Sequence, residues 1–307
     1  MSFSSDVKEE LCKPEVKGRH CQLAELAALV SFLGADRDGV FCVHTENVHV
    51  AKRCYMLIKQ AFGIAADVKK ISSGADTKRG AYEVTASEKD VKKILEGVKF
   101  TDAAFTSMPI SAILLQKECC RRSFLRGAFV SAGSMSDPEK SYHFEIVCGT
   151  MEQALQIQDV LAGFSVQAGI VRRKKRLVAY VKEGNDIIDI LNLMGAHSSL
   201  MNMENVRILK DMRNRVNRRV NCETANLSKT VGAAARQIKD IEYLEKNGLL
   251  LTLSPALVQA ASLRKKYPDA SLTELGEMSD PPVGRSGMNH RLAKLSGLAQ
   301  KAREKQE

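Results

Sequence analysis

The sequence predicts an α+β domain made of two copies of one structural unit, followed by an all-α domain. Three observations predict this organisation. The apolar segment LAALVSFLG at 26–34 returns as LRGAFVSAG at 125–133, similar strand and helix patterns follow both copies in the same order, and helical patterns continue beyond about residue 202. A chain of 307 residues is long enough for two domains, each with its own core.

The predicted elements of the two units follow an N-terminal helix within 1–18. After its apolar helix, the first unit, about 19–100, contains a strand at 41–44, a helix at 48–62, alternation through Ile64, Ala66 and Val68, a strand at 81–87, and a helix with Asp90, Val91, Ile94 and Leu95. The second unit, about 118–202, repeats them as 144–148, 151–164, Val166, Ala168 and Ile170, 177–182, and a helix with Asp186, Ile187, Ile190 and Leu191. Each unit reads helix, two strands, helix, two strands, helix, with antiparallel hairpins.

Chance similarity of amphipathic segments is the alternative explanation of the repeat, because apolar helices resemble one another easily. Five elements that recur in order at one spacing favour duplication over chance. We therefore expect the two units to pack together as a pseudo-dimer.

Composition points to a polyanionic partner. The chain has 46 Lys and Arg residues against 36 Asp and Glu residues, a formal charge of +10, with 44% apolar residues. These values predict a globular, basic protein. Trp is absent and only 5% of residues are aromatic, which argues against a surface that stacks single-stranded bases on exposed rings. We expect double-stranded DNA as the partner.

Targeting and metal-binding patterns are not evident in the sequence. The N-terminus MSFSSDVKEELCK mixes both charges, and no apolar run has the length of a membrane span, so we expect a cytoplasmic, nucleoid-associated protein without membrane contact. His44 and His49 have no Cys or acid near enough in sequence to complete a zinc set, and we expect no metal, no cofactor and no small-molecule substrate. The absence of a CxxC pair predicts reduced, mostly buried thiols at Cys12, Cys21, Cys42, Cys54, Cys119, Cys120, Cys148 and Cys222.

The two apolar segments resemble the LAGLIDADG helices of homing endonucleases, two of which pack against each other at the centre of a saddle whose sheets straddle DNA. Small residues that permit close helix packing occur in both copies, at Ala27, Ala28, Gly34, Gly127, Ala128 and Gly133. In that family the eighth position of each motif is an acid that binds the catalytic metal. Those positions are Leu33 and Ala132 here, and neither can coordinate Mg²⁺. Asp36, Asp38 and Asp137 lie several residues beyond the motifs, and this shift moves them off the helix ends. We therefore expect that the protein is not an enzyme.

A helical bridge is predicted over 203–249, as one helix from about Glu204 and a second over 227–246 that ends at Asn247-Gly248. Basic residues dominate the first of these helices, at Arg207, Lys210, Arg213, Arg215, Arg218 and Arg219. They are candidates for contact with the DNA backbone, with solvation of a bridging helix as the alternative. A second basic run falls at the predicted hairpin turn of the second unit, where phosphate contact and a solubilising cluster are equal alternatives: Arg172, Arg173, Lys174, Lys175 and Arg176.

Residues 250–307 predict a helix-turn-helix domain. Ser254-Pro255 begins a helix that ends at Tyr267-Pro268, Ser271 and Glu274 fit a capping box, and Ser286 is expected to cap a third helix that runs to about Ala299. Met288, Leu292 and Leu295 face inward on that helix. The connection from Met278 to Ser286 is about two residues longer than the usual turn.

The polar face of the third helix has the side chains that read DNA. Arg can chelate guanine, Asn can chelate adenine, and Ser or backbone N–H groups can hold phosphate. Our DNA-binding candidates are Ser271, Thr273, Arg285, Ser286, Asn289, His290, Arg291 and Lys294. A small helical cap with a solvated polar face is the alternative.

The order of these parts resembles the bacterial WhiA family over essentially the whole chain. Two stretches are specific to that family: NRRVNCETANLSKT at 217–230 and LSPALVQAASLRKKYPDASLTELGEMSDPPVGRSGMNHRL at 253–292. The resemblance implies a DNA-binding transcription regulator of cell division, chromosome segregation and sporulation, with a C-terminal domain similar to the promoter-reading domain of sigma factors and no nuclease activity. The transcription machinery or another regulator is the protein partner it suggests.

Two other functions remain as hypotheses. The first is an architectural or adaptor protein that binds DNA, or another protein, mainly through the repeat domain. The second is an active homing-type endonuclease that uses displaced acids such as Asp36 or Asp137. A metal-dependent nick that Asp36→Asn abolishes would support the endonuclease.

Overall fold

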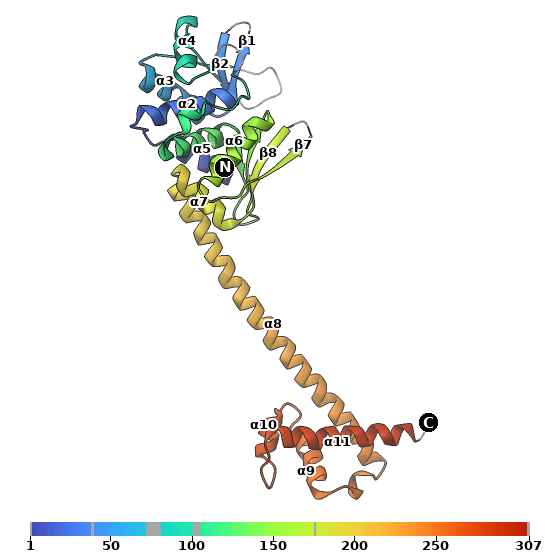
Figure 1. Ribbon diagram of the computed structural model, residues 1–307. Coiled ribbons are helices and arrows are strands. Elements are labelled where there is room, and N and C mark those ends of the chain that lie inside the picture. The colour runs from blue at the N-terminus through green and yellow to red at the C-terminus, as the bar shows by residue number, and fades with distance from the viewer. Residues whose placement is uncertain (1, 38–39, 72–80, 101–104, 175, 306–307) are drawn as a thin grey trace. The chain divides into compact units, whose positions relative to one another are not determined.

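The structure is a computed structural model, and it describes residues 2–37, 40–71, 81–100, 105–174 and 176–305 (Figure 1). The chain forms two compact units, Met1–Lys210 and Asp211–Glu307. In the described part of the chain, no helix is both long and apolar enough to cross a membrane.

The first repeat of unit 1 contains the elements in the predicted order. Helix α1 (Phe3–Cys12) precedes α2 (Arg19–Leu33), β1 (Gly34–Arg37), β2 (Val40–Thr45), α3 (Val48–Phe62), β3 (Asp67–Ile71), β4 (Ala81–Thr85) and α4 (Glu88–Gly97). The four strands form an antiparallel sheet in the order β1-β2-β4-β3.

The second repeat reproduces this topology after a short 3-10 helix, η1 (Ala112–Leu115). Its elements are α5 (Glu118–Ala132), β5 (Gly133–Met135), β6 (Phe144–Cys148), α6 (Met151–Ala162), β7 (Gly169–Arg173), β8 (Arg176–Val181) and α7 (Gly184–Met194). The sheet has the order β5-β6-β8-β7, again antiparallel. Both repeats therefore confirm the predicted α+β unit of helix, two strands, helix, two strands, helix.

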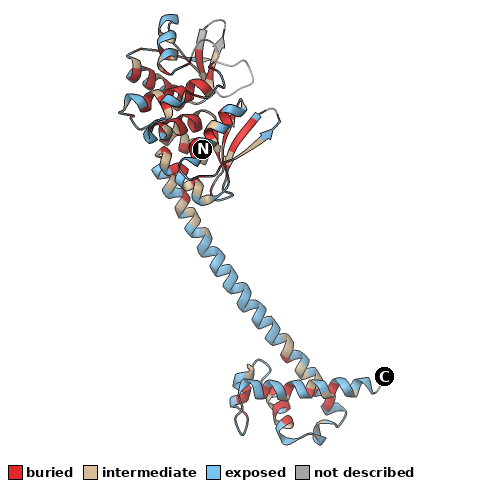
Figure 2. Cartoon of the chain, in the orientation of Figure 1, coloured by how far each residue is buried: buried red, intermediate tan, exposed pale blue. Residues whose placement is uncertain are grey.

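Helices α2 and α5 pack against each other at the centre of unit 1 (Figures 1 and 2). The sequence allows this close packing because small residues lie at the crossing. A Cβ atom at Gly127 would lie 2.7 Å from the Glu25 carbonyl oxygen and 2.9 Å from the Ala28 Cβ, so only glycine fits there. Residues Leu26–Val30 are fully buried, because neighbouring elements surround this part of α2.

Helix α8 (His197–Lys246) is one continuous helix of 50 residues, so the prediction of two separate helices in the bridge was wrong. The segment between them contains no Pro or Gly to interrupt the backbone hydrogen bonds. The helix is followed by Gly248, which has a φ of 70° in the left-handed region, as the Asn247-Gly248 signal predicts. Residues 211–230 are exposed on every side of α8 (Figure 2).

Unit 2 contains the C-terminal end of α8, η2 (Leu250–Thr252), α9 (Pro255–Lys266), α10 (Leu272–Glu277) and α11 (Arg285–Glu304). These elements enclose one small core, whose members are Ile241, Leu244, Leu257, Ala260, Ala261, Leu275, Met288, Leu292, Leu295 and Ala299. The inward orientation predicted for Met288, Leu292 and Leu295 is confirmed, since each is at most 1% exposed. The core includes the last turns of α8, which therefore form part of the folded C-terminal unit.

Candidate nucleic-acid interface

The first turn of α11 has free backbone donors. Its N-cap is Gly284, and no side chain caps the helix, so the prediction that Ser286 caps it was wrong. Ser286 instead lies in the first turn, because the connection from α10 ends two residues earlier than expected. Arg285 and Ser286 are exposed there. An uncapped helix N-terminus combines unpaired N–H groups with a partial positive charge, and this arrangement suits a phosphate.

The exposed face of α11 carries polar side chains directly behind that turn. Asn289, His290 and Lys294 are exposed, on the sides of the helix that its buried residues leave free. Arg285 and Asn289 are four residues apart and so share one face. This face can present an amide and a guanidinium to base edges in a major groove.

Arg291 differs from its expected place. It is half-buried, and its Nη1 atom is buried without a hydrogen-bond partner in the described structure. The prediction required the guanidinium to point outward, but part of it is buried. The residue lies next to Leu292 in sequence, at the edge of the buried stripe of α11, and this position explains its partial burial.

The second helix of the motif begins with the predicted capping box. The Ser271 hydroxyl accepts a hydrogen bond from the Glu274 N–H (3.3 Å), and the Ser271 N–H donates to Glu274 Oε2 (2.7 Å). These hydrogen bonds hold the pKa of the Glu274 carboxyl below its usual value. Ser271 thus serves the helix start, whereas Thr273 is exposed on the first turn of α10.

A buried arginine, which no sequence pattern marked as functional, shapes the turn between α9 and α10. Arg264 is 2% exposed, and its Nη1 donates to the carbonyl oxygens of Pro268 (3.2 Å) and Ala270 (2.7 Å). Burial lowers the pKa of its guanidinium. In the sequence, Arg264 only continues the helical pattern of α9, and the folded turn supplies its hydrogen-bond acceptors.

The connection between α10 and α11 folds back on α10. Val283 donates its N–H to the Gly276 carbonyl (3.0 Å), and the Ser279 hydroxyl donates to the Gly276 carbonyl (2.8 Å). A Cβ at Gly276 would collide with the Val283 carbonyl oxygen. The longer connection is therefore a fixed turn that determines where α11 begins.

The basic run of the second repeat lies at a hairpin, as predicted. Arg172, Arg173, Lys174 and Arg176 are exposed at the ends of β7 and β8, and Lys174 has the positive φ of a tight turn. Lys175 lies outside the described residues.

One of these cations is engaged with an acid on the sheet. Arg173 Nη1 lies 2.9 Å from Glu145 Oε2. Burial raises the pKa of Glu145, but hydrogen bonds from Ser134 and His143 and the charges of His143 and Arg173 outweigh it, so the pKa lies below its usual value. Arg173 is therefore less available for phosphate than its exposed neighbours.

The basic residues of α8 fall into two groups. Arg207 donates to Asn185 Oδ1 (2.7 Å) and Lys210 donates to the Pro138 carbonyl (2.7 Å), so both are held against unit 1. Arg219 pairs with Glu223 at 2.9 Å. The remaining arginines of the run, which are exposed and have no ion pair among the described residues, are Arg213, Arg215 and Arg218.

The positions of the endonuclease acids carry no carboxylate. Leu33 and Ala132 lie half-buried at the C-terminal ends of α2 and α5, beside a cavity of ≈ 520 Å³ whose described lining contains Ser131 and Gln153 but no acid. An adjoining cleft does contain Glu9, which forms an ion pair with Lys13 at 3.0 Å.

Asp137, one of the displaced acids, is not in the described lining of this cavity. Asp137 accepts a hydrogen bond from the Glu139 N–H (2.9 Å) in the loop after β5. Asp36 belongs to β1, and Asp38 lies outside the described residues.

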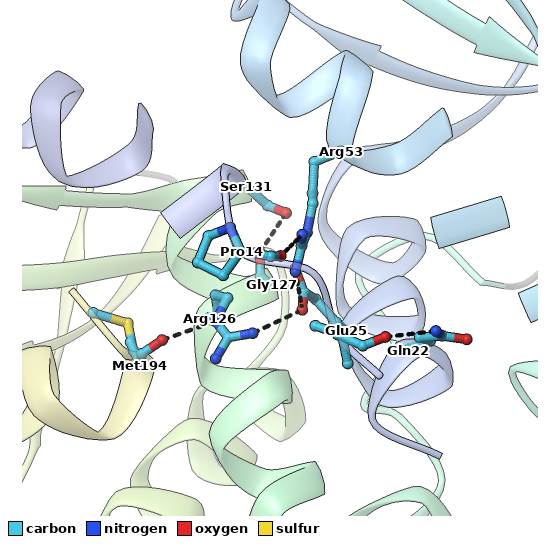
Figure 3. A network of polar contacts seen from close by, with 9 residues as sticks. Pro14, Gln22, Glu25, Arg53, Arg126, Gly127, Ser131 and Met194 are labelled. Atoms are coloured by element: carbon cyan, nitrogen blue, oxygen red, sulfur yellow. Dashed lines mark hydrogen bonds and ion pairs between the residues drawn. The ribbon is translucent and has the colours of Figure 1, made fainter. Parts of the chain in front are cut away.

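A buried charge network joins the two repeats (Figure 3). Glu25 on α2 is 1% exposed and accepts from Arg53 Nε (2.6 Å), Arg53 Nη2 (2.9 Å) and Arg126 Nη1 (3.3 Å). Arg126 on α5 also donates to the Met194 carbonyl (2.8 Å), and Arg53 on α3 donates to the Pro14 carbonyl. No sequence pattern marked these residues, because they come from three separate helices.

A possible metal-binding cluster also has no counterpart in any local sequence pattern. His20 and Cys21 lie in the first turn of α2, and Cys119 and Cys120 lie in the first turn of α5. Their ligand atoms all lie within 4.8 Å of one another. We expected no metal because no set of ligands lies close together in the sequence, whereas these two pairs are about a hundred positions apart.

Comparisons with known proteins assign each part of the chain. Family models match at 19–101 (WhiA N-terminal LAGLIDADG-like domain), at 121–213 (WhiA LAGLIDADG-like domain) and at 216–299 (WhiA C-terminal HTH domain). The chain is similar to a probable cell division protein WhiA of Lachnoclostridium phytofermentans, with 45% identity over 99% of this chain and 100% of the relative. A probable cell division protein WhiA of Lachnospira eligens is also 45% identical, over 99% of this chain and 98% of the relative.

A solved structure agrees in fold. The crystal structure of full-length WhiA from Thermatoga maritima matches 98% of this chain and 99% of that chain, with a TM-score of 0.61 and 23% identity. The three family models and the full-length relatives together establish that this chain belongs to the WhiA family, with two LAGLIDADG-like repeats and a C-terminal helix-turn-helix domain.

Proposed function

We propose that this protein is a DNA-binding transcription regulator that reads bases with α11 and takes part in cell division, chromosome segregation and sporulation. The observation that carries the proposal is the exposed polar face of α11 behind an uncapped helix N-terminus. Its relatives in two other bacteria are named probable cell division proteins, which supports the cellular role. The protein would act at the nucleoid, in the cytoplasm.

Each part of the face has a proposed role. The free N–H groups at the start of α11, with Arg285 and Ser286, hold a backbone phosphate and fix the register of the helix. Asn289 then chelates an adenine, while His290 and Lys294 contact neighbouring bases or phosphates. Arg291 joins them only if its guanidinium turns away from the buried position of Nη1.

Asn289→Ala tests base readout directly. We expect a loss of about 1–3 kcal/mol in discrimination at one base position, while affinity for unrelated duplexes stays the same. Binding to a randomised duplex library measures this preference. The matched control is Lys301→Ala, an exposed change on the same helix near its other end. An equal loss of affinity for every sequence would contradict base readout by Asn289.

The exposed arginines of α8 are proposed to supply affinity for DNA that does not depend on the base sequence. Arg213, Arg215 and Arg218 are exposed and free of ion pairs within the described chain. Replacing all three by Gln should make the dependence of log affinity on log salt shallower, by about one for each phosphate that an arginine had neutralised. An unchanged slope would show that these arginines solvate α8 only.

The same arginines and the basic hairpin favour a second candidate function, an architectural or adaptor protein that binds DNA outside the helix-turn-helix. This candidate predicts that Arg172→Gln with Arg176→Gln weakens binding to every duplex, while Asn289→Ala changes nothing. Genome-wide footprinting of the two variants separates the candidates, since a regulator loses its specific sites only with Asn289.

We propose that the repeat domain does not cleave DNA. Leu33 and Ala132 leave the motif positions without hard oxygen ligands, which supports this proposal. Incubation of the protein with a duplex library and Mg²⁺ or Mn²⁺ tests it. Metal-dependent nicking that Asp36→Asn or Asp137→Asn abolishes would reverse it.

A further inference from the structure

The first turns of α2 and α5 bring together one histidine and three cysteines that the proposed DNA-binding function does not use. His20 and Cys21 come from one helix, and Cys119 and Cys120 come from the other. The two residue pairs belong to different repeats, so a ligand held by all four would connect the halves of unit 1. Cys21, Cys119 and Cys120 form no disulfide, and they lie together near His20.

We propose that His20, Cys21, Cys119 and Cys120 bind one zinc ion in a tetrahedral site that ties the two repeats together. Three thiolates and one imidazole are a standard donor set for structural zinc. Such a site is closed, with four protein ligands and no position for a substrate. Its role is therefore to stabilise the packing of α2 on α5.

The distances fit a single ion. His20 Nδ1 lies 3.2 Å from Cys21 Sγ, 3.2 Å from Cys120 Sγ and 3.9 Å from Cys119 Sγ. With Zn–S bonds of about 2.3 Å and a Zn–N bond of about 2.0 Å, the N···S edge of a tetrahedron is about 3.5 Å. The three separations lie on both sides of this value, so only small side-chain shifts are needed.

Two helix N-termini and a lysine would stabilise the negative charge of the zinc complex. One Zn²⁺ with three thiolates has a net charge of −1, and this charge would lie at the N-termini of two 15-residue helices. Neither N-cap, Gly18 or Lys117, makes a side-chain capping hydrogen bond. Both helix ends therefore direct their partial positive charge toward the site, and Lys117 adds a full positive charge near Cys120.

Disulfide formation is the main alternative use of clustered cysteines, and it needs a two-electron oxidant. Zinc binding involves no oxidation: each of the three thiols releases its proton to solvent and donates a lone pair to the ion.

Access to the site is from one side. Cys21 and Cys120 are buried at 8% and 3% exposure and pack with Val16 and Ala24, whereas His20 and Cys119 are exposed. An ion can enter past the exposed pair, and a chelator can remove it. The exposed ligands are also the best positions for substitution, since neither belongs to the core.

Zinc content of the purified full-length chain is the primary test. We expect about one zinc ion per chain by elemental analysis, and a thiolate-to-metal absorption band when Co²⁺ replaces zinc. His20→Ala and Cys119→Ser should each weaken zinc binding about tenfold or more. His20→Cys should restore binding, because four thiolates also form a structural zinc site. Cys222→Ser, at an exposed cysteine in unit 2, is the matched control and should bind zinc normally.

A second measurement counts protons. Calorimetric titration of the chelator-treated chain with zinc chloride, in buffers of different ionisation enthalpy, should show proton release and weaker binding at lower pH. Excess chelator should lower the unfolding temperature of the native chain and leave that of His20→Ala unchanged.

Three results would overturn the proposal. The first is a chain that contains no zinc and takes up none from zinc chloride. The second is equal zinc loss in Cys222→Ser and Cys119→Ser. The third is a disulfide among Cys21, Cys119 and Cys120, found by mass spectrometry in protein prepared under reducing conditions.

Discussion

Glu25→Ala removes the acid at the centre of the buried network that joins α2, α3 and α5 (Figure 3). The carboxylate is 1% exposed and accepts three charge-assisted hydrogen bonds, at 2.6, 2.9 and 3.3 Å. Without it, Arg53 retains a single hydrogen bond to the Pro14 carbonyl while remaining 5% exposed. A buried cation would then lack its counter-charge, which is among the most destabilising single changes.

The expected loss is about 3–5 kcal/mol in the free energy of unfolding. For a unit of about 200 residues, this corresponds to a fall of about 6–20 °C in Tm. Thermal unfolding followed by circular dichroism measures it. Glu223→Ala is the matched control, because it breaks the exposed pair with Arg219 and should change Tm little.

A double-mutant cycle sharpens this prediction. Arg53→Met alone leaves Glu25 without its two shortest hydrogen bonds, whereas Glu25→Ala with Arg53→Met removes both charges of this pair. The double variant should lose less stability than the sum of the single variants, by about 1–3 kcal/mol. A loss below about 1 kcal/mol for Glu25→Ala, or strict additivity in the cycle, would refute the reasoning.

Three further predictions concern packing, the reading unit and pH. Gly127→Ala should lower the free energy of unfolding by about 1–3 kcal/mol, measured by chemical denaturation, because the new Cβ would meet the Glu25 carbonyl oxygen. Gly297→Ala is the control and should not destabilise the protein, since nothing lies within 4 Å of a Cβ there. Arg264→Met should destabilise unit 2 by about 1–3 kcal/mol, since the carbonyls of Pro268 and Ala270 lose their hydrogen-bond donor. Limited proteolysis should then cleave α9 more readily than in the unchanged protein, and equal cleavage would contradict this. The pKa of Glu145 is lowered in the folded state, so this carboxylate stabilises the fold above its ordinary pKa of 4.5, and the stabilisation is lost as the pH falls through the lowered value. Glu145→Gln should therefore make the free energy of unfolding depend less on pH in that range, and an unchanged acid unfolding curve would contradict this.

The order of elements could be predicted from the sequence because it depends on local periodicity. Helix α3 and strand β6 have the predicted bounds, Val48–Phe62 and Phe144–Cys148. The bridge was predicted less well. A second helix was predicted over 227–246, but no proline interrupts the backbone hydrogen bonds before it, and the helix is continuous. The start of α11 was misplaced for a similar reason, because the turn formed by Gly276 and Val283 determines it rather than the capping propensity of Ser286.

The sequence by itself determined the duplication, the loss of the motif acids at Leu33 and Ala132, and the helix-turn-helix with its inward stripe, since each depends on residue type and spacing along the chain. Tertiary structure alone decided which distant residues meet. Glu25 reaches Arg53 because α2 packs on α3. Glu25 reaches Arg126, and His20 reaches Cys119 and Cys120, because α2 packs on α5. These contacts span up to about a hundred positions, and no local pattern encodes a partner that the chain reaches only after both repeats have folded.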